Sequence, residues 1–270
     1  MNKSSLKSIW EAPIYLPYLQ PTLTDEMVKE AENLIGFRLP YEYVNLLKIQ
    51  NGGYIRYTLK NTPHSVIAGI GLNYPSITDF EWFRSYDDYM SFSLEGLFPF
   101  DGDGHWNLCL DYRKNNLEPE ITYIDTESDF EELIASNFSC YLNMLEIEVE
   151  DEYIIQLALS IEYTITQISN ITNIKFEEPD YFAHGYAVYR GMFNGSWVWV
   201  SPNKVPRGFI RETEDRYEEL KTQMEGTALR FPEVPENSVI INISDETQGA
   251  QLINKLIENG LSINKLKDLI

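Results

Sequence analysis

Apolar residues near the start of the chain recur at intervals of three and four, the period of one helix face. The first such stretch covers residues 24–36, where Thr24 suits an N-cap and Gly36 a C-terminal stop. A second stretch begins at Pro40, a residue tolerated in the first turn of a helix, and ends at Asn51-Gly52-Gly53. The pattern predicts two consecutive helices.

From residue 54 the pattern changes to short runs rich in β-branched and aromatic residues. We expect these runs to form one sheet, with strands at residues 54–59, 65–72, 96–100, 106–112 and 121–125. A helix is predicted over residues 129–147, because Ser128 and Glu131 have the spacing of a capping box. Its buried face would carry Phe130, Leu133, Ile134, Phe138, Tyr141 and Leu142.

A run of acidic residues at 146–152 separates these elements from a second set and predicts two domains, 1–148 and 149–270. The second set begins with a helix carrying Ile154, Leu157, Ala158, Ile161 and Ile165. Strands are expected at 173–178, 185–193, 196–201 and 238–244, and helices at 217–224 and 246–258. The predicted class is α+β: N-terminal helices packed on a mainly antiparallel sheet with a closing helix, followed by a second, small α+β domain.

Composition adds constraints on class and location. The 270 residues are 43% hydrophobic and 13% aromatic, enough for real cores. We expect a cytoplasmic protein without a membrane span, because no apolar run is long enough and the first residues lack the apolar stretch of a secretory signal. Cys109 and Cys140 are the only cysteines, which excludes a disulfide framework and a four-cysteine zinc site. Both cysteines are expected in the core.

The net charge of −21 favours a basic protein partner and disfavours nucleic acid and anionic lipid. Residues 1–150 carry 10 Lys and Arg against 24 Asp and Glu, a net −14. Residues 151–270 carry 11 against 18, a net −7. The acidic excess lies mainly in the first half, although acidity can also serve solubility alone.

The stretch "PFDGDGHWNLCLDYR", residues 99–113, has the composition of a calcium loop. An EF-hand needs oxygen ligands at positions 1, 3 and 5, glycine at 6 and glutamate at 12. Counted from Asp101, positions 5, 6 and 12 are His105, Trp106 and Tyr112, so the pattern fails. Asp-Gly pairs between apolar runs favour a tight turn instead. We therefore predict a hairpin at Asp101–Gly104 and no metal.

Other arrangements with catalytic potential are weak. His64, His105 and His184 lie in no metal-binding spacing and are interpreted as ordinary strand or loop residues. A Cys109–His105 dyad is unfavourable, because four residues of extended strand separate Cα atoms by about 13 Å. A carboxylate-dependent hydrolase remains as an alternative, using Asp101 with Asp103 or Asp125 with Glu127. We predict no enzyme activity and no cofactor.

Residues 79–90, which we call the acidic aromatic segment, interleave aromatic and acidic side chains. Exposed aromatic residues supply binding energy at protein interfaces, and carboxylates steer basic partners. The predicted partner-binding residues are Trp82, Phe83, Tyr86, Asp87, Asp88 and Tyr89. The alternative is that the aromatic residues belong to the core and the acids to a solvated face.

Basic residues gather at residues 204–216, after Trp197 and Trp199, in the pattern of a nucleic-acid contact. They are Lys204, Arg207, Arg211 and Arg216, and acidic residues follow them at once. An intramolecular or solvated role is favoured.

Three motifs in order resemble the SUKH superfamily over residues 10–145: "LPYEYVNLLKIQNGGYI", "PFDGDGHWNLCLDYR" and "ITYIDTESDFEELIASNFSCYL". This superfamily includes a fungal regulator of cell-wall synthesis and many bacterial immunity proteins against secreted toxins. The resemblance implies protein binding without catalysis. Its fold-defining residues would be Leu39, Pro40, Tyr43, Asn51, Gly52, Gly53, Gly102, Gly104 and Asp111.

The leading hypothesis is a non-catalytic immunity protein that neutralises a bacterial polymorphic toxin, its partner being a basic toxin domain. A regulatory scaffold of cell-wall or glucan synthesis is the first alternative, and the hydrolase is the second. Residues 149–270 lie outside the resemblance, and their role is not predicted.

Overall fold

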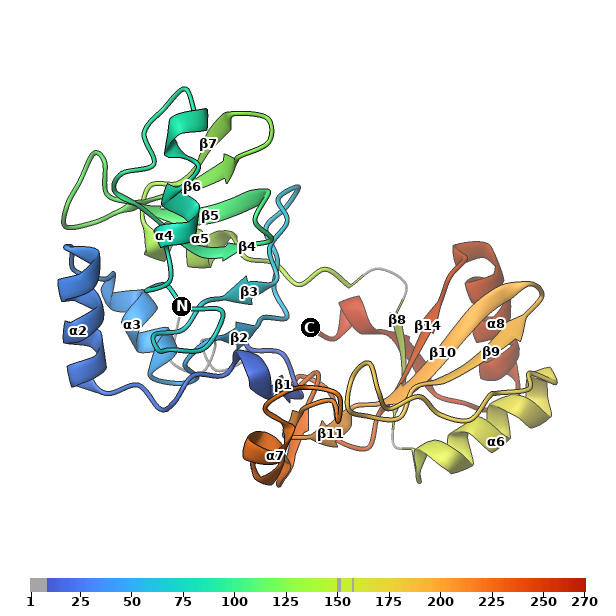
Figure 1. Cartoon of the computed structure of the whole chain (residues 1–270). Coiled ribbons are helices and arrows are strands. Elements are labelled where there is room, and N and C mark those ends of the chain that lie inside the picture. Colours follow the sequence, from blue (N-terminus) through green and yellow to red (C-terminus); the bar gives the residue numbers. More distant parts are fainter. Residues whose placement is uncertain (1–8, 150–151, 157) are drawn as a thin grey trace. The chain divides into compact units, whose positions relative to one another are not determined.

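A computed structural model describes residues 9–149, 152–156 and 158–270. The chain divides into two compact units, Met1–Glu148 and Val149–Ile270 (Figure 1). Each unit has its own helices, antiparallel sheet and hydrophobic core, which confirms the predicted α+β class.

The two N-terminal helices are confirmed as α2, Asp25–Ile35, and α3, Tyr41–Leu47. The Thr24 side chain accepts a hydrogen bond from the Met27 amide, and Gly36 ends α2 with a φ of 82°. Short elements precede these helices, the strand β1 (Ile14–Tyr15) and the 3-10 helix η1 (Leu16–Tyr18).

The first unit contains a four-stranded antiparallel sheet in the order β4-β5-β6-β7. Its strands are β4 (Leu97–Gly102), β5 (Trp106–Asp111), β6 (Glu120–Asp125) and β7 (Phe130–Ala135). The expected single sheet is wrong, since β2 (Gly53–Tyr54) and β3 (Val66–Ile67) form a separate pair. These strands are only two residues long, and the bond from the Ala68 amide to the Phe100 carbonyl links this region to β4.

The central strand β5 is buried on both faces. Leu108, Leu110 and Tyr112 lie in the main core with residues of α2 and α3, while Cys109 packs in a smaller cluster with Phe83. Alternating residues of an extended strand point to opposite faces, so a strand in the middle of the unit needs apolar residues at successive positions.

The helix predicted over residues 129–147 is wrong in its first half. Residues 130–135 form β7 at the sheet edge, and the helix α5 spans Phe138–Met144. Asp125 accepts hydrogen bonds from the amides of Glu127 and Ser128 in the turn that leads back along β6. Pairing with β6 overrides the local helical spacing, so Phe130 and Leu133, expected to be buried, are exposed. Cys140 is also exposed, contrary to prediction.

A buried polar network links β4 to α5. Asp101 Oδ2 lies 2.7 Å from His64 Nδ1 and accepts hydrogen bonds from the amides of Ser65 and Val66. His64 Nε2 contacts the Tyr141 hydroxyl at 2.5 Å. With its proton on Nδ1, His64 donates to Asp101 and accepts from Tyr141, so both ring nitrogens are satisfied.

Asp111, at the end of β5, is held by Arg113 and Thr122. Burial raises the pKa of its carboxyl. The hydrogen bonds from Arg113 and Thr122 lower this pKa by more than burial raises it, so the net shift is downward. Arg113 also contacts Glu131 on β7, which connects the central strand to the sheet edge.

The second unit has a five-stranded antiparallel sheet in the order β15-β8-β14-β10-β9. Its strands are β8 (Glu152–Ile155), β9 (Tyr189–Phe193), β10 (Ser196–Pro202), β14 (Val239–Ile243) and β15 (Ile263–Lys265). The helices α6 (Ile161–Thr172) and α8 (Glu246–Glu258) contribute to one core with the sheet. Further elements are β11 (Lys204–Pro206), β12 (Gly208–Phe209), α7 (Tyr217–Leu220), η3 (Lys221–Met224), β13 (Thr227–Leu229) and η4 (Leu266–Asp268).

Two predictions for this unit are wrong. Ile154, expected on a helix, lies in β8 because this strand pairs with both β14 and β15, and Leu157 falls outside the described residues. Residues 173–178 form no strand, although the Glu177 amide bonds to the Arg190 carbonyl. The helix predicted at 246–258 is confirmed with the same bounds.

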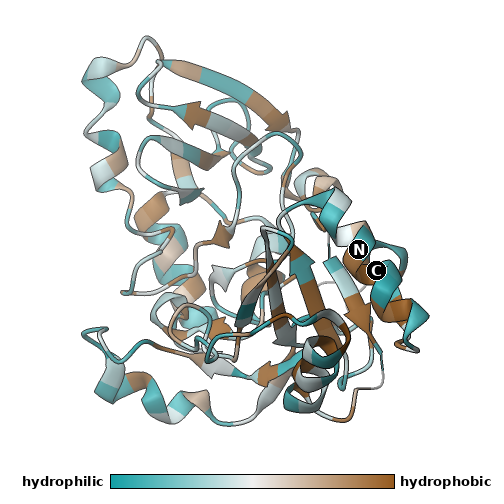
Figure 2. Cartoon of the chain, turned by 90° about the vertical axis from the view of Figure 1, so that its right-hand side faces the viewer, coloured by the Kyte–Doolittle hydropathy of each residue, from teal (hydrophilic) through white to brown (hydrophobic). Residues whose placement is uncertain are grey.

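Figure 2 shows helices that carry hydrophobic residues on one side and hydrophilic residues on the other, as expected for helices packed against a core. Within the described part of the chain, no helix combines the length and apolar composition needed to cross a bilayer.

Gly102 and Gly104 both have positive φ, but they differ in their surroundings. A Cβ on Gly102 would lie 2.4 Å from the Trp106 carbonyl oxygen, whereas one on Gly104 would meet no atom within 4 Å. Gly102→Ala should therefore lower the free energy of unfolding by about 2–4 kcal/mol, and Gly104→Ala by about 1 kcal/mol. Urea unfolding measures both. Equal losses of stability in the two variants would contradict the close packing of Gly102 against Trp106. In a separate test, a calcium-dependent rise in melting temperature that Asp101→Asn abolishes would contradict a purely structural role for the turn.

Asp101→Ala should lower the free energy of unfolding by about 3 kcal/mol or more, because His64 and three backbone amides, those of Ser65, Val66 and Gly102, lose their acceptor. Asp103→Ala is the matched control: Asp103 is exposed and accepts from the amides of His105 and Trp106, so its loss should cost about 1 kcal/mol. Equal losses in urea unfolding would show that the buried network adds nothing to stability.

We predict that residues 1–148 and 149–270 fold independently, since each unit contains its own core. Limited proteolysis should cut within residues 146–152 and leave two stable fragments. Each fragment, expressed alone, should unfold cooperatively. Degradation of the whole chain without two stable fragments would argue for one integrated domain.

Candidate functional site

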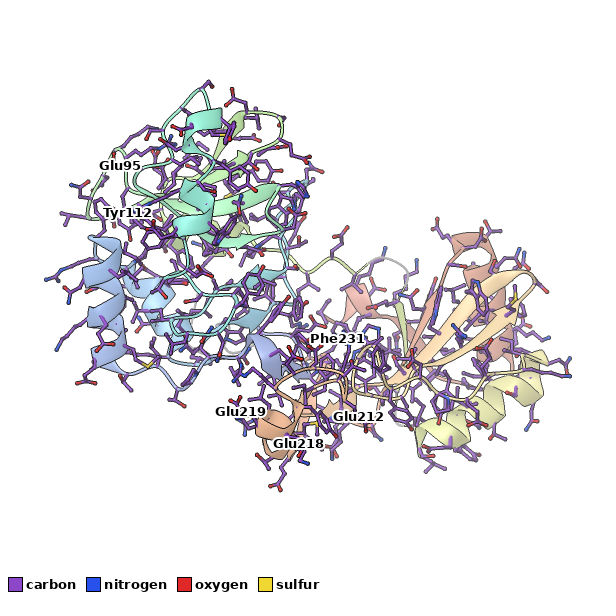
Figure 3. The ribbon with its side chains drawn as sticks, viewed as in Figure 1. Glu95, Tyr112, Glu212, Glu218, Glu219 and Phe231 are labelled. Atoms are coloured by element: carbon purple, nitrogen blue, oxygen red, sulfur yellow. The ribbon has the colours of Figure 1, made fainter. Side chains whose placement is uncertain are left out.

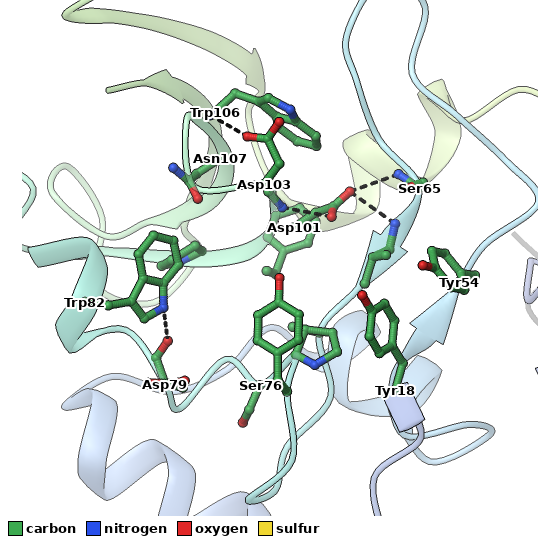
Figure 4. A pocket seen from close by; sticks show the side chains of 17 residues that line it. Tyr18, Tyr54, Ser65, Ser76, Asp79, Trp82, Asp101, Asp103, Trp106 and Asn107 are labelled. Atoms are coloured by element: carbon green, nitrogen blue, oxygen red, sulfur yellow. Dashed lines mark hydrogen bonds between the residues drawn. The ribbon is translucent and has the colours of Figure 1, made fainter. Parts of the chain in front are cut away.

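A cavity of about 250 Å³ lies beside the β4–β5 hairpin in the first unit (Figure 4). Six aromatic side chains and three aspartates line it, together with a buried asparagine and smaller residues. The aromatic, acidic and amide members are Tyr18, Tyr54, Tyr74, Trp82, Phe100, Trp106, Asp79, Asp101, Asp103 and Asn107. We call this feature the hairpin cavity.

The aromatic residues of the hairpin cavity come from segments far apart in the sequence. Tyr18 ends η1, Tyr54 lies in β2, and Trp106 begins β5. The Tyr18 ring centroid lies 5.0 Å from that of Tyr54 and 5.8 Å from that of Tyr74. The Trp82 indole, from the helix α4 (Glu81–Arg84), donates to the Asp79 carbonyl at 2.8 Å. Ring contacts and this bond thus position the aromatic walls.

The three aspartates differ in how they are held. Asp101 belongs to the buried network, and its Oδ1 also accepts from the Gly102 amide. Burial raises the pKa of Asp103, but hydrogen bonds from the amides of Trp106 and His105 bring the net pKa below its ordinary value. The Asp79 carboxylate is exposed and has no hydrogen-bond or ion-pair partner among the described residues.

Negative charge dominates the hairpin cavity. The pKa of Tyr74 is raised, first by burial and then by the charges of Tyr18, Asp101, Asp103 and Asp79. None of the described residues that line the cavity is basic. A cation is therefore the ligand charge that this site favours.

Asn107 is the unusual member of the lining. It is fully buried in β5, yet neither Oδ1 nor Nδ2 of its side chain has a hydrogen-bond partner in the described structure. Figure 4 shows it at the end of the cavity where Trp82 and Trp106 also lie.

The structure places the residues predicted for partner binding in different environments. Trp82 is 36% exposed, Tyr86 38% and Tyr89 79%, as a contact surface requires. Phe83 is fully buried and packs on Cys109, so its prediction as a contact residue is wrong. Phe80, Phe83 and Tyr86 recur at intervals of three residues, as on one face of a helix. Because α4 is a single turn that ends at Arg84, this spacing does not reveal that Phe83 is buried and Tyr86 is exposed.

The two acids of this segment also differ. Asp87 accepts a hydrogen bond from the Leu94 amide at 2.5 Å and so holds the loop that follows η2 (Asp87–Tyr89). Asp88 is exposed and has no bonding partner among the described residues. Asp88 is the better probe of long-range attraction, since its replacement leaves the local bonds intact.

Sequence reasoning missed most of the hairpin cavity. Tyr18, Tyr54, Tyr74 and Asn107 were not predicted as site residues, and only Trp82 belongs both to the acidic aromatic segment's predicted contacts and to the cavity. The abundance of tyrosine, 18 residues in the chain, is the one signal in the sequence, and it gives no positions.

The acid pairs proposed for hydrolysis have structural contacts. Asp101 and Asp103 accept hydrogen bonds from backbone amides of the β4–β5 hairpin, and Asp125 accepts them from those of the β6–β7 turn. Glu127 forms an exposed pair with His105 at 2.7 Å. His64, interpreted as an ordinary residue, is a buried partner of Asp101. In the described part of the chain, no three His, Cys, Asp or Glu residues are grouped to hold a metal ion.

The basic residues at 204–216 mostly pair with acids of their own unit. Arg211 contacts Glu214 at 3.2 Å, and Arg216 contacts Glu219 at 2.7 Å. Figure 3 shows Glu212, Glu218 and Glu219 in this region, so its surface carries both charges. The favoured intramolecular role is consistent with these pairs.

A larger cavity of about 690 Å³ lies along α2 and α3, near Leu39 and Pro40. It contains both basic and acidic residues, and Lys48 and Asp25 neutralise each other at 2.7 Å. Because its lining carries both charges, this larger cavity favours no particular ligand charge, whereas the acidic hairpin cavity favours a cation.

Residues 22–144 match the model of the SMI1 / KNR4 family (SUKH-1). No curated protein matches the chain in sequence. The family supports an immunity or a regulatory role in general, and its domains generally bind proteins without catalysis. The resemblance predicted from the motifs is confirmed over the part of the first unit that contains both helices, the sheet and most of the hairpin cavity: residues 22–144 form an SMI1 / KNR4 (SUKH-1) domain of the SUKH superfamily.

Proposed function

We propose that this chain is a non-catalytic immunity protein whose first unit binds and blocks a basic toxin domain. The observation that carries the proposal is the hairpin cavity, in which six aromatic side chains and three aspartates meet with no basic residue among the described lining. Aromatic anchors and unneutralised carboxylates are the groups that a binder of a basic protein needs.

The acidic aromatic segment extends this surface. Asp79 and Trp82 belong to both features, and Tyr86, Asp88 and Tyr89 are exposed further along the chain. The net charge of −14 in residues 1–150 acts over a longer range and attracts a basic partner before contact. Long-range attraction and short-range anchoring thus lie in the same unit.

A regulatory scaffold of cell-wall or glucan synthesis is the second candidate. The specific observation that favours it is the row of Tyr and Trp rings in the hairpin cavity, because such rings combine an apolar face with a polar tip that suits a partly wet ligand. The three carboxylates favour a basic partner over a neutral saccharide, since only a cationic ligand gains charge attraction from them and none of the described lining residues is basic.

Co-expression with the toxins encoded beside the gene should protect the cell from one of them, and the purified pair should form a tight complex.

Asp88→Lys should slow association several-fold at low salt, with the difference shrinking as salt rises. Tyr86→Ala should mainly speed dissociation, costing about 2 kcal/mol if Tyr86 is an anchor. Surface plasmon resonance measures both rates.

The matched control is Glu30→Lys on α2, which makes the same charge change outside both the segment and the hairpin cavity. It should alter association less than Asp88→Lys. Absence of protection against every neighbouring toxin, with no complex at low salt, would refute the immunity role and favour the scaffold.

A further inference from the structure

Asn107 has an unsatisfied side-chain amide in the wall of the hairpin cavity. The residue is 0% exposed, and both Oδ1 and Nδ2 lack partners in the described structure. Buried polar groups are nearly always hydrogen-bonded, so an unpaired one calls for a specific explanation. Its position in the lining makes a bound ligand the natural partner.

The close packing of the hairpin fixes this amide in place. A Cβ on Gly102 would lie 2.5 Å from Asn107 Oδ1, so the backbone of Gly102 passes directly beside the amide oxygen. The neighbouring residues Leu108 and Leu110 are fully buried, which leaves β5 little freedom to turn the side chain elsewhere. The unpaired amide is therefore a fixed feature of the site.

The charge of the site selects a cation. Asp79, Asp101 and Asp103 line the cavity, and the Asp79 carboxylate has no partner among the described residues. A ligand that brings hydrogen-bond donors and a positive charge would satisfy this carboxylate and Asn107 Oδ1 together.

The shape of the site selects a planar cation of side-chain size. Its volume of about 250 Å³ lies below the range of about 300–1,000 Å³ found for pockets of drug-sized ligands. Trp82 and Trp106 both line the cavity, and a guanidinium stacks on aromatic rings while donating hydrogen bonds in its plane. A lysine ammonium is a compact point charge and uses such faces less well.

We propose that the hairpin cavity takes the side chain of one arginine presented by the protein partner, whose guanidinium donates hydrogen bonds to Asn107 Oδ1 and the Asp79 carboxylate. This inference rests on the proposed binding of a basic protein and names the group that the site recognises. A saccharide is the competing occupant, and the experiment below distinguishes it.

The test uses the full chain labelled with ¹⁵N-asparagine and three probes: N-acetyl-arginine N-methylamide, the corresponding lysine derivative and methyl glucoside. The arginine derivative should shift the Asn107 side-chain amide signal, identified as the one absent from Asn107→Leu, and change tryptophan fluorescence. We expect a dissociation constant on the order of 1 mM, since a ligand of this size gains little free energy per atom. The lysine derivative should bind about tenfold more weakly.

Two variants locate the binding. Asp79→Asn should weaken arginine binding at least fivefold, whereas the matched control Glu30→Gln on α2, with the same charge change outside the cavity lining and the acidic aromatic segment, should leave it within twofold. Asn107→Leu should abolish binding while its melting temperature stays equal or rises, because an apolar side chain of similar size removes an unsatisfied buried group. If Asn107→Leu fails to fold, the comparison of Asp79→Asn with Glu30→Gln decides the question.

Each remaining outcome overturns the inference. Binding of methyl glucoside with no response to the arginine derivative would identify a saccharide site. Equal binding of the arginine and lysine derivatives, or equal effects of Asp79→Asn and Glu30→Gln, would show that only general electrostatic attraction is at work. If none of the three probes changes the Asn107 amide signal or the tryptophan fluorescence, and the protein still protects against a toxin, the arginine site is rejected and the proposed function stands.

Discussion

The Asp101 carboxylate is the constraint on which the first unit depends. It is almost completely buried and joins three parts of the chain: the turn of the β4–β5 hairpin, the backbone at Ser65 and Val66, and, through His64, the helix α5. A buried carboxylate destabilises a fold unless donors surround it. Since its donors come from distant segments, the network forms only when those segments are all in place, and it thereby specifies one arrangement.

The hairpin cavity follows from that arrangement. The turn after Asp101 positions Asp103 and Trp106, and β5 carries Asn107 into the wall of the cavity. On the other side of the hairpin, Ala68 donates its amide to Phe100 and keeps the β3 region against β4. The same contacts that stabilise the unit therefore hold the binding groups without a ligand, which reduces the entropy lost on binding.

Stability and binding conflict at one residue of this site. Asn107 lies in a strand that is buried at five of its six positions, where an apolar residue would serve the core better, and its amide has no partner in the described structure. Proteins often retain such local costs where a ligand is recognised. The acidic charge has a similar double character, because it attracts a basic partner from a distance and disfavours compaction through self-repulsion.

The sequence by itself determined the features that depend on neighbouring residues. The capped helix α2, the stop at Gly36, the Asp-Gly hairpin and the bounds of α8 were predictable, because side-chain capping, positive φ and helical spacing act within a few positions. Motifs in their order along the chain were also enough to indicate the SUKH superfamily, which the match over residues 22–144 confirms.

Tertiary structure decided the rest. Residues 130–135 have the apolar spacing of a helix, and pairing with β6 makes them a strand. Phe83 and Trp82 are adjacent in the sequence, and only the packing of α4 shows which of them faces solvent. Tyr18, Tyr74, Trp106 and Asn107 come together through pairings between segments tens of residues apart, which local patterns cannot encode. The sequence thus supplies the side chains of the proposed binding site, while the tertiary structure brings them together in one cavity.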